Sequence, residues 1–122
     1  ENYMSPIEVV VAETACAGKV DELIGRVPEL VEGWTNQLTA CESAGQTLLE
    51  LPSFELSAKN SNNFQVIGML YKVIYDFQRE HELPEIVRIL CDSKATAKMY
   101  RQIYNFYIAP TKADRLNDGD WD

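Results

Sequence analysis

The 122-residue sequence has little of the chemistry that enzymes use. It contains a single histidine, and it lacks a Gly-x-Ser-x-Gly segment and the glycine-rich motifs that cradle phosphates. A general base needs a nucleophile or a substrate proton within reach, and no motif in this sequence supplies a nucleophile. These absences predict that the protein is not an enzyme.

Cysteine is also scarce and widely spaced. The chain has three cysteines, Cys16, Cys41 and Cys91, and no C-x-x-C pair. This spacing argues against a zinc site and against a thioredoxin-like redox motif. We therefore expect neither a metal ion nor another cofactor.

Targeting and membrane signals are missing as well. The sequence shows no initiator Met, no charged-then-apolar leader and no N-glycosylation sequon. Its longest apolar run, residues 64–77, is interrupted by Lys72 and Asp76 and is too short to span a bilayer. We expect a mature product from which any signal peptide has been removed.

The charge is acidic and unevenly spread. The formal net charge of −8 divides into −8 for residues 1–57, +3 for residues 58–112 and −3 for the last ten residues. Such a field is unfavourable for binding nucleic acid or an anionic membrane. A basic or bipolar protein is the partner that this distribution favours, although acidity can also serve solubility alone.

Proline punctuates a succession of helix-forming segments. Ser5 and Pro6 supply a helix N-cap and a first-turn proline. Pro28 opens a second segment, whose apolar residues follow the spacing of one buried helical face. These signals predict helices at residues 5–24 and 28–52.

The second half of the chain continues the helical pattern. A third helix, capped by Asn62 or Asn63, is apolar over so much of its surface that we expect it to be central. Gly68 within it is expected to allow close helix packing. Shorter helices are predicted at residues 84–90 and, after a cap at Asp92 or Ser93, up to Pro110. Because no useful alternating strand pattern appears, the predicted fold is all-α, an irregular antiparallel bundle of four to five helices.

The predicted helical hairpin suggests one disulfide. If the first two helices fold back on each other around Pro28, Cys16 and Cys41 lie at the same level. We expect these two to pair, and an odd number of cysteines leaves at least one thiol free. Pairing of Cys91 with either of them, or no disulfide at all, remains open.

The chain is predicted to divide into a single helical domain, residues 1–110, and a mobile acidic tail, residues 111–122. The acids of the tail do not match a calcium-binding loop. Trp121 is an aromatic residue in this otherwise polar segment. It either anchors a segment that orders on binding or docks back onto the domain.

Aromatic and basic residues on the last predicted helix form a second candidate for a protein-binding surface. Tyrosine and arginine are favoured at interface hot spots because they combine rigid area with directional hydrogen-bond donors. The alternative is that the tyrosines are half-buried at the edge of the core. The residues concerned are Lys94, Lys98, Tyr100, Arg101, Tyr104 and Tyr107.

The single histidine, His81, lies between two glutamates just before Pro84. It falls at the end of a predicted helix, where the helix dipole favours a positive charge. We therefore interpret His81 as a partner of the helix dipole and not as a catalytic base.

Three stretches of the chain carry a family resemblance. Residues Ile67–Glu80, Ile89–Lys94 and Tyr104–Pro110 resemble the small salivary proteins of anopheline mosquitoes, the anophensin and albicin group. The chain length, the predicted helices and the missing leader agree with that group. The odd cysteine count departs from the usual pairing of thiols in secreted proteins.

The resemblance implies a secreted salivary antagonist of host defence. It implies a non-enzymatic inhibitor that binds C3b and factor B and blocks the C3 convertase of the alternative complement pathway. An inhibitor of the plasma contact pathway, acting on kininogen or kallikrein, is the alternative within the group. No functional residue of the family carries over to a numbered position of this chain.

Two other classes of function remain open. A carrier of a small apolar ligand would use the interior of the predicted bundle, lined by the third helix and Met69. An intracellular adaptor domain would keep three free thiols. Neither class has a motif of its own in the sequence.

Overall fold

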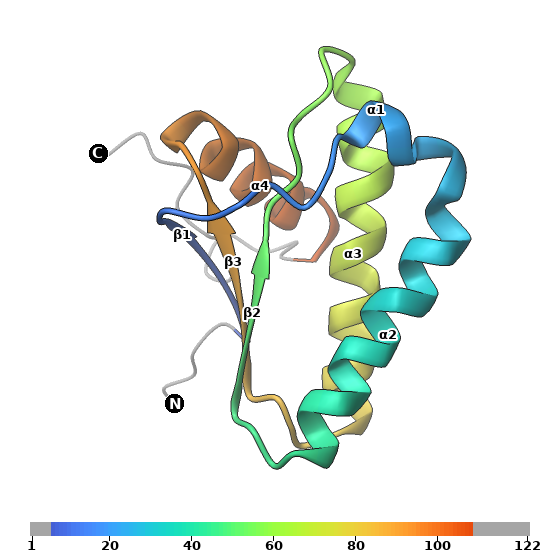
Figure 1. The fold of residues 1–122 in the computed structure, drawn as a ribbon, viewed down its shortest axis with the longest axis vertical. Coiled ribbons are helices and arrows are strands. Elements are labelled where there is room, and N and C mark those ends of the chain that lie inside the picture. The colour runs from blue at the N-terminus through green and yellow to red at the C-terminus, as the bar shows by residue number, and fades with distance from the viewer. Residues whose placement is uncertain (1–5, 109–122) are drawn as a thin grey trace.

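The computed structural model describes residues 6–108, and its fold is α/β (Figure 1). In chain order, the elements are β1 (Ile7–Val11), α1 (Val20–Leu23), the 3-10 turn η1 (Ile24–Arg26), α2 (Val27–Ser43), β2 (Leu48–Pro52), α3 (Asn60–Glu80), β3 (Ile86–Cys91) and α4 (Lys94–Tyr107). The predicted all-α bundle of four to five helices is therefore wrong.

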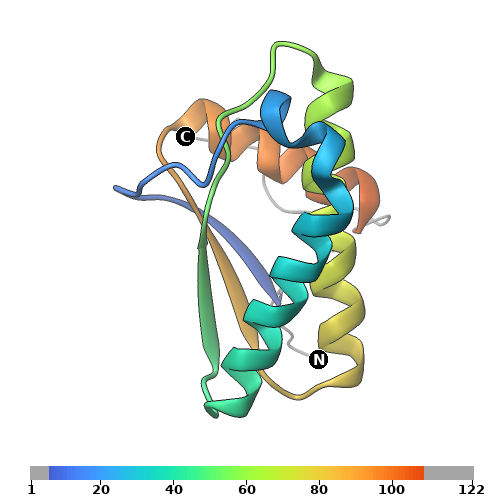
Figure 2. The same cartoon turned by 45° about the vertical axis from the view of Figure 1, so that its right-hand side comes forward.

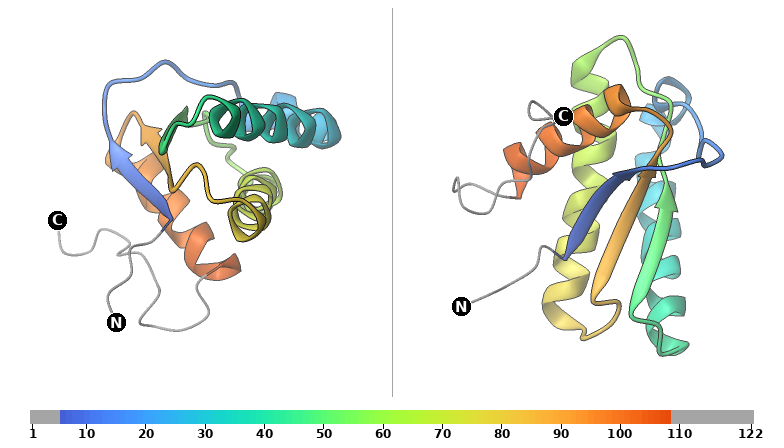
Figure 3. Two further views of the ribbon diagram at one scale, coloured as in Figure 1. Left: turned by 90° about the horizontal axis from the view of Figure 1, so that it is seen from below. Right: turned by 90° about the vertical axis from the view of Figure 1, so that its left-hand side faces the viewer.

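The three strands form one parallel sheet in the order β1-β3-β2. Ile89 in the central strand lies between Val9 of β1 and Leu51 of β2. The helices α2, α3 and α4 all lie on one side of this sheet, as two rotated views show (Figures 2 and 3). The described part of the chain is thus a two-layer sandwich of helices on a sheet.

The core fills the space between the two layers. Ile7 and Ile89 from the sheet and Ile67 and Ile74 from α3 are fully buried. The helix α3 packs against α1, α2 and α4, which confirms the expectation that the third helix is central. Burial of these side chains supplies the main driving force for folding.

Two strands were mistaken for helices because their residues are apolar over short runs. β1 has the sequence Ile-Glu-Val-Val-Val, in which four of the five residues are β-branched. β3 alternates between half-buried and buried side chains along Ile86–Cys91. Such short runs fit a helix or a strand equally well from periodicity alone, and β-branched side chains favour the strand.

The second predicted helix was extended too far because a glycine ends it early. α2 stops at Ser43, and Gly45 has a left-handed φ of +71°. The amide of Gln46 donates to the carbonyl of Cys41 and the amide of Gly45 to that of Glu42. This is the hydrogen-bond pattern of a Schellman motif, which terminates α2 and lets the chain reverse into β2.

The predicted disulfide is absent, since all three cysteines are free. Cys16 is exposed in the segment between β1 and α1, whereas Cys41 is buried near the end of α2. These segments lie at opposite ends of the molecule (Figure 1). The pairing assumed a helical hairpin, and residues 7–11 form a strand instead.

Two local predictions for the helices are confirmed, whereas the helix starts predicted at Pro6 and at Asn62 or Asn63 are wrong, since β1 follows Pro6. Ser93 caps α4, its hydroxyl accepting a hydrogen bond from the amide of Thr96 at 3.2 Å. Pro28 lies in the first turn of α2, as predicted. Neither Asn62 nor Asn63 caps α3, which begins at Asn60, and the amide side chain of Asn63 instead holds the backbone of Ser57.

Candidate protein-binding surfaces

Two of the three tyrosines predicted for the binding surface are in the core. Tyr100 is fully buried, and its hydroxyl accepts a hydrogen bond from the amide of Phe54 at 2.9 Å. Tyr71 of α3 donates its hydroxyl to the carbonyl of Tyr100 at 2.8 Å. The ring of Tyr71 also packs edge-on against Tyr104, which is buried as well. Tyr100 and Tyr104 therefore join α4 to α3 and to the segment after β2.

Burial also changes the acid–base properties of this region. Desolvation raises the pKa of Tyr100 and that of Tyr71 above the ordinary value of tyrosine. It raises the pKa of the Cys91 thiol to about 12. All three groups are thus held in their neutral forms, which disfavours a nucleophilic thiolate at Cys91.

The other predicted contact residues have different surroundings. Lys94 and Lys98 are exposed on α4. Arg101 is half-buried, and its guanidinium donates to the carbonyl of Val9 at 3.0 Å, which ties α4 to β1. Trp121 lies outside the described residues, as does the predicted acidic tail.

Tyr107 is the predicted tyrosine that reaches the surface. Its side chain is 49% exposed, and that of the preceding Phe106 is 71% exposed. The Tyr107 ring packs in a tilted arrangement against Phe64 of α3, at a centroid distance of 6.2 Å. The Phe106 ring packs edge-on against the same residue, at 5.5 Å. The last turn of α4 therefore presents an aromatic cluster to solvent.

A groove of about 600 Å³ adjoins this cluster along the outer side of α3. We call it the α3 groove. Its volume falls in the range of ligand sites in proteins. Its walls combine aromatic and apolar side chains with charged ones, and they include Phe64, Met69, Lys72, Tyr75, Arg79 and Tyr107.

A glycine positions the tyrosine of the groove. A Cβ atom added at Gly68 would come within 2.5 Å of the Tyr107 ring, so the ring lies directly on the backbone of α3. This contact confirms that Gly68 allows close packing of the two helices. It also restricts where Tyr107 can lie and so shapes the groove in advance of binding.

The charges of the groove are only partly neutralised. Lys72 forms an exposed ion pair with Asp76 at 3.2 Å. The guanidinium of Arg79 lies 5.4 Å from the centre of the Tyr75 ring, a cation–π arrangement. Among the described residues, no carboxylate forms a salt bridge with Arg79.

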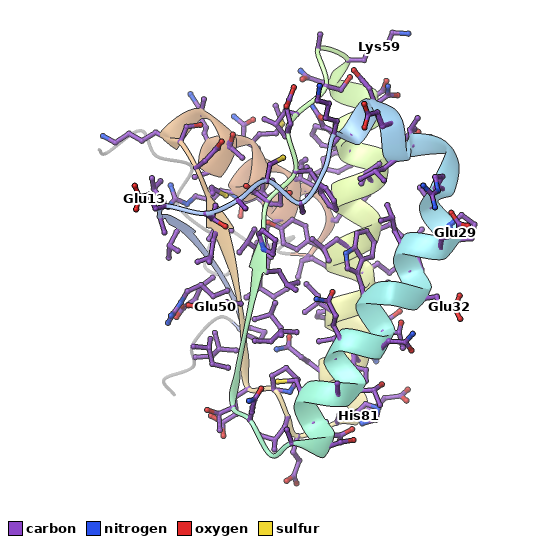
Figure 4. The ribbon with its side chains drawn as sticks, viewed as in Figure 1. Glu13, Glu29, Glu32, Glu50, Lys59 and His81 are labelled. Atoms are coloured by element: carbon purple, nitrogen blue, oxygen red, sulfur yellow. The ribbon has the colours of Figure 1, made fainter. Side chains whose placement is uncertain are left out.

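His81 lies at the far end of α3 from the aromatic cluster (Figure 4). Its ring stacks on Phe77 at 3.9 Å, and its Nδ1 atom lies 2.9 Å from a carboxylate oxygen of Glu42. The partner of His81 is therefore an acid of α2. The ring serves to join the ends of α2 and α3.

Residues 6–108 contain neither a metal-binding cluster nor a membrane-spanning helix. Within residues 6–108, no group of three or more His, Cys, Asp or Glu side chains is arranged to hold a metal ion. No helix of that part of the chain is both long enough and apolar enough to cross a bilayer.

The sheet offers a second surface, because no described helix covers its outer side (Figure 3). At its centre, Arg88 of β3 donates to Glu8 of β1 at 2.9 Å and to Glu50 of β2 at 3.1 Å. Glu50 points away from the helices (Figure 4). The rows on either side of this triad are apolar: Val10, Leu90 and Pro52 on one side, Leu48 and Ile86 on the other. We call this surface the open face.

Sequence reasoning missed most of these surface residues. Phe106 was not selected from the sequence, and the buried side of α4 passes through Ala97, Tyr100, Ile103 and Tyr104, which leaves Phe106 exposed. The helical period alone could not decide which aromatic residues of this helix face the core. No family model, curated protein sequence or solved structure matches the chain.

Proposed function

We propose that this chain is a non-catalytic binding domain that recognises a partner protein through the α3 groove. The observation that carries the proposal is the exposed Tyr107 in the wall of this groove, with the exposed Phe106 packed against Tyr107 and Phe64. Exposed aromatic side chains grouped beside a groove are typical of interaction sites. Their apolar area is in contact with water in the isolated domain, so burying it against a partner would be favourable.

The groove also indicates the chemistry of the partner. Phe64, Met69 and Tyr107 offer an apolar seat for an aromatic or long aliphatic side chain. Arg79, which no carboxylate of the described chain neutralises, offers a guanidinium for an acid. We therefore expect a partner segment that combines an apolar anchor with a nearby aspartate or glutamate.

Preorganisation favours binding at this site. Tyr107 is held against Gly68, and Phe64 packs against both exposed rings. Rings with a fixed position lose little conformational freedom on binding. A rigid aromatic surface of this kind suits a protein that acts by occupying a partner and blocking its other contacts.

The inhibition of the C3 convertase stays a prediction that comes from the family resemblance. The predicted helices were part of the support for this resemblance, and the α/β fold removes that part. The contact pathway and secretion in saliva likewise stay predictions. A ligand carrier would need the bundle interior that this fold lacks, and Met69 lines the surface groove instead.

The experiment is a capture from human plasma, with and without activation of the alternative pathway, read by mass spectrometry. The baits are the wild-type chain, the double variant Phe106→Ala/Tyr107→Ala, and a control, Gln102→Ala, on the same helix. Gln102 is exposed away from the groove. We expect one partner to be retained by the wild type and the control and lost by the aromatic double variant.

Specific outcomes decide each part of the proposal. Enrichment of C3b and factor B only after activation would support the convertase prediction, and kininogen or kallikrein would support the contact pathway. A partner that the aromatic double variant captures as well as the wild type does would refute binding through the α3 groove. Plasma from which no bait captures anything specific would refute a plasma target.

A further inference from the structure

We infer that the open face is a second docking surface, which takes an amphipathic helix of a partner protein with one basic residue in its apolar stripe. This site lies on the sheet, whereas the α3 groove lies on the helical layer. The inference therefore goes beyond the proposed function and does not depend on it.

The architecture gives the first argument. Sheets made wholly of parallel strands occur almost always with both faces covered. Here the three strands are all parallel, and the described helices cover one face. The open face is accordingly the side on which a covering layer is expected, and helices are the elements that cover parallel sheets.

The composition of the face gives the second argument. Side chains on a solvated sheet face are usually polar, but five of the eight strand positions on this side are apolar. Leu48 at the outer edge is 36% exposed, and Pro52 is exposed on the same strand. Val10 and Leu90 are half-buried. An apolar row on each side of a charged row is the pattern of an interface.

The size of the face fits one helix. Three strands spaced about 4.8 Å apart are roughly 10 Å wide between the outer two, which matches the 10–12 Å diameter of a helix with its side chains. β1 and β2 have five residues each and β3 has six, a length of roughly 17–20 Å. A helix of about 12 residues covers that length.

The charges specify the occupant further. Arg88 is bonded by two carboxylates, Glu8 and Glu50, so the central row carries a net charge of one negative unit. The Glu50 side chain is 46% exposed and has room for another donor. A lysine or arginine of the occupant would complete the row, since each carboxylate accepts several hydrogen bonds.

The same charges argue against a second copy of this chain. Two copies facing each other would bring two negative rows together, and each chain carries a formal net charge of −8. Like charges at a desolvated contact weaken association. The negative row attracts a basic partner, whereas it repels a second copy of the chain.

The test uses the isotope-labelled full chain and a three-turn amphipathic peptide of leucine and lysine, followed by amide chemical shifts. The controls are a scrambled peptide of the same composition and a peptide with glutamate in place of lysine. We expect the amphipathic lysine peptide to shift residues 7–11, 48–52 and 86–91, and the controls to bind about tenfold more weakly. Equal binding of the scrambled peptide would show non-specific attraction and overturn the inference.

Variants locate the site and separate it from the α3 groove. Leu48→Glu places an acid at an exposed position and is expected to weaken the peptide about tenfold, without unfolding the chain. Glu50→Gln removes a charge from the central row on the same strand without changing an apolar residue, and we expect about threefold weaker binding. Tyr107→Ala should leave peptide affinity unchanged.

Three results would contradict the inference. Shifts confined to α3 and α4 would place the peptide in the groove. Unchanged affinity in both Leu48→Glu and Glu50→Gln would remove the open face as the site. A dimer of the free chain in sedimentation, abolished by Leu48→Glu, would identify a second copy as the occupant.

Discussion

The middle and the last turn of α4 use the same kind of residue for opposite purposes. In the middle of the helix, Tyr100 is buried and bonded to the backbone of Phe54. In the last turn, Tyr107 and Phe106 are exposed beside a groove. Residue type alone therefore does not separate core from surface, and the helical position relative to α3 decides the role.

The helix α4 thus has one part that stabilises the fold and another part that is free to bind a partner. The first part ties α4 to the sheet and to α3, through Tyr100, Tyr104 and the bond from Arg101 to Val9. The second part contributes few buried contacts.

Truncation of Tyr100 should cost far more stability than truncation of Tyr107. Tyr100→Ala removes a fully buried ring, which typically costs about 3–5 kcal/mol. Tyr107→Ala removes a half-exposed ring and should cost less than about 1 kcal/mol. Urea unfolding of the two variants measures the difference, and equal losses would contradict the division of α4.

The hydroxyl of Tyr100 should matter on its own. Tyr100→Phe keeps the ring but leaves the amide of Phe54 without its acceptor, at a cost of about 1–3 kcal/mol. The control, Tyr107→Phe, should change the free energy of unfolding by less than about 0.5 kcal/mol. A neutral Tyr100→Phe would mean that the bond from Phe54 does not contribute to stability.

Alkaline pH should weaken the buried part of the molecule. Burial raises the pKa of Cys91 in the folded state to about 12 from an ordinary value of 9.0. The unfolded chain therefore loses this proton first, so stability is complete below pH 9.0 and falls as the pH rises toward about 12. Between pH 9 and 10 the loss should be about 1 kcal/mol.

Two cysteine variants identify the source of that loss. Cys91→Ala should reduce the fall in unfolding free energy between pH 8 and pH 10, below the range in which tyrosines ionise. A smaller fall should remain, because burial also raises the pKa of the Cys41 thiol. Cys16→Ala, at an exposed thiol, should show the same fall as the wild type. An equal fall in all three proteins would show that Cys91 is not the group responsible.

Replacement of Gly68 should reshape the groove with little change in stability. In Gly68→Ala, the new methyl group displaces the Tyr107 ring, while alanine favours the helix by about 1 kcal/mol over glycine. We expect a net stability change within about 1 kcal/mol and weaker capture of the plasma partner. Gly33→Ala on α2, where a Cβ meets nothing within 4 Å, is the control and should leave capture unchanged.

Local signals in the sequence predicted the helical half of the fold. The apolar period predicted the helix α3, and the serine before α4 predicted its N-cap. Both predictions are confirmed, because each signal depends only on residues that are close together in the chain. The strands could not be predicted in the same way. β2 has the sequence Leu-Leu-Glu-Leu-Pro, which becomes a strand by pairing with β3, some 40 residues away in the register. Such pairing is a property of the tertiary fold.

The binding surfaces depend on the fold even more strongly. Tyr107 was predicted because tyrosine is frequent at interfaces, whereas Phe106 was not, and Met69 was named only as the lining of an internal ligand cavity. The open face could not be predicted from the sequence, because it exists only when three strands form a sheet. Its charged row joins Glu8, Glu50 and Arg88, which are far apart in the chain.

Binding through the α3 groove is tested most simply by the affinity of the purified plasma partner for four forms of the chain: wild type, Phe106→Ala, Tyr107→Ala and Leu48→Glu. Each aromatic variant should bind about tenfold more weakly or worse, while Leu48→Glu on the sheet should bind as the wild type does. If Leu48→Glu alone loses affinity, the partner binds the open face and the α3 groove is not the primary site.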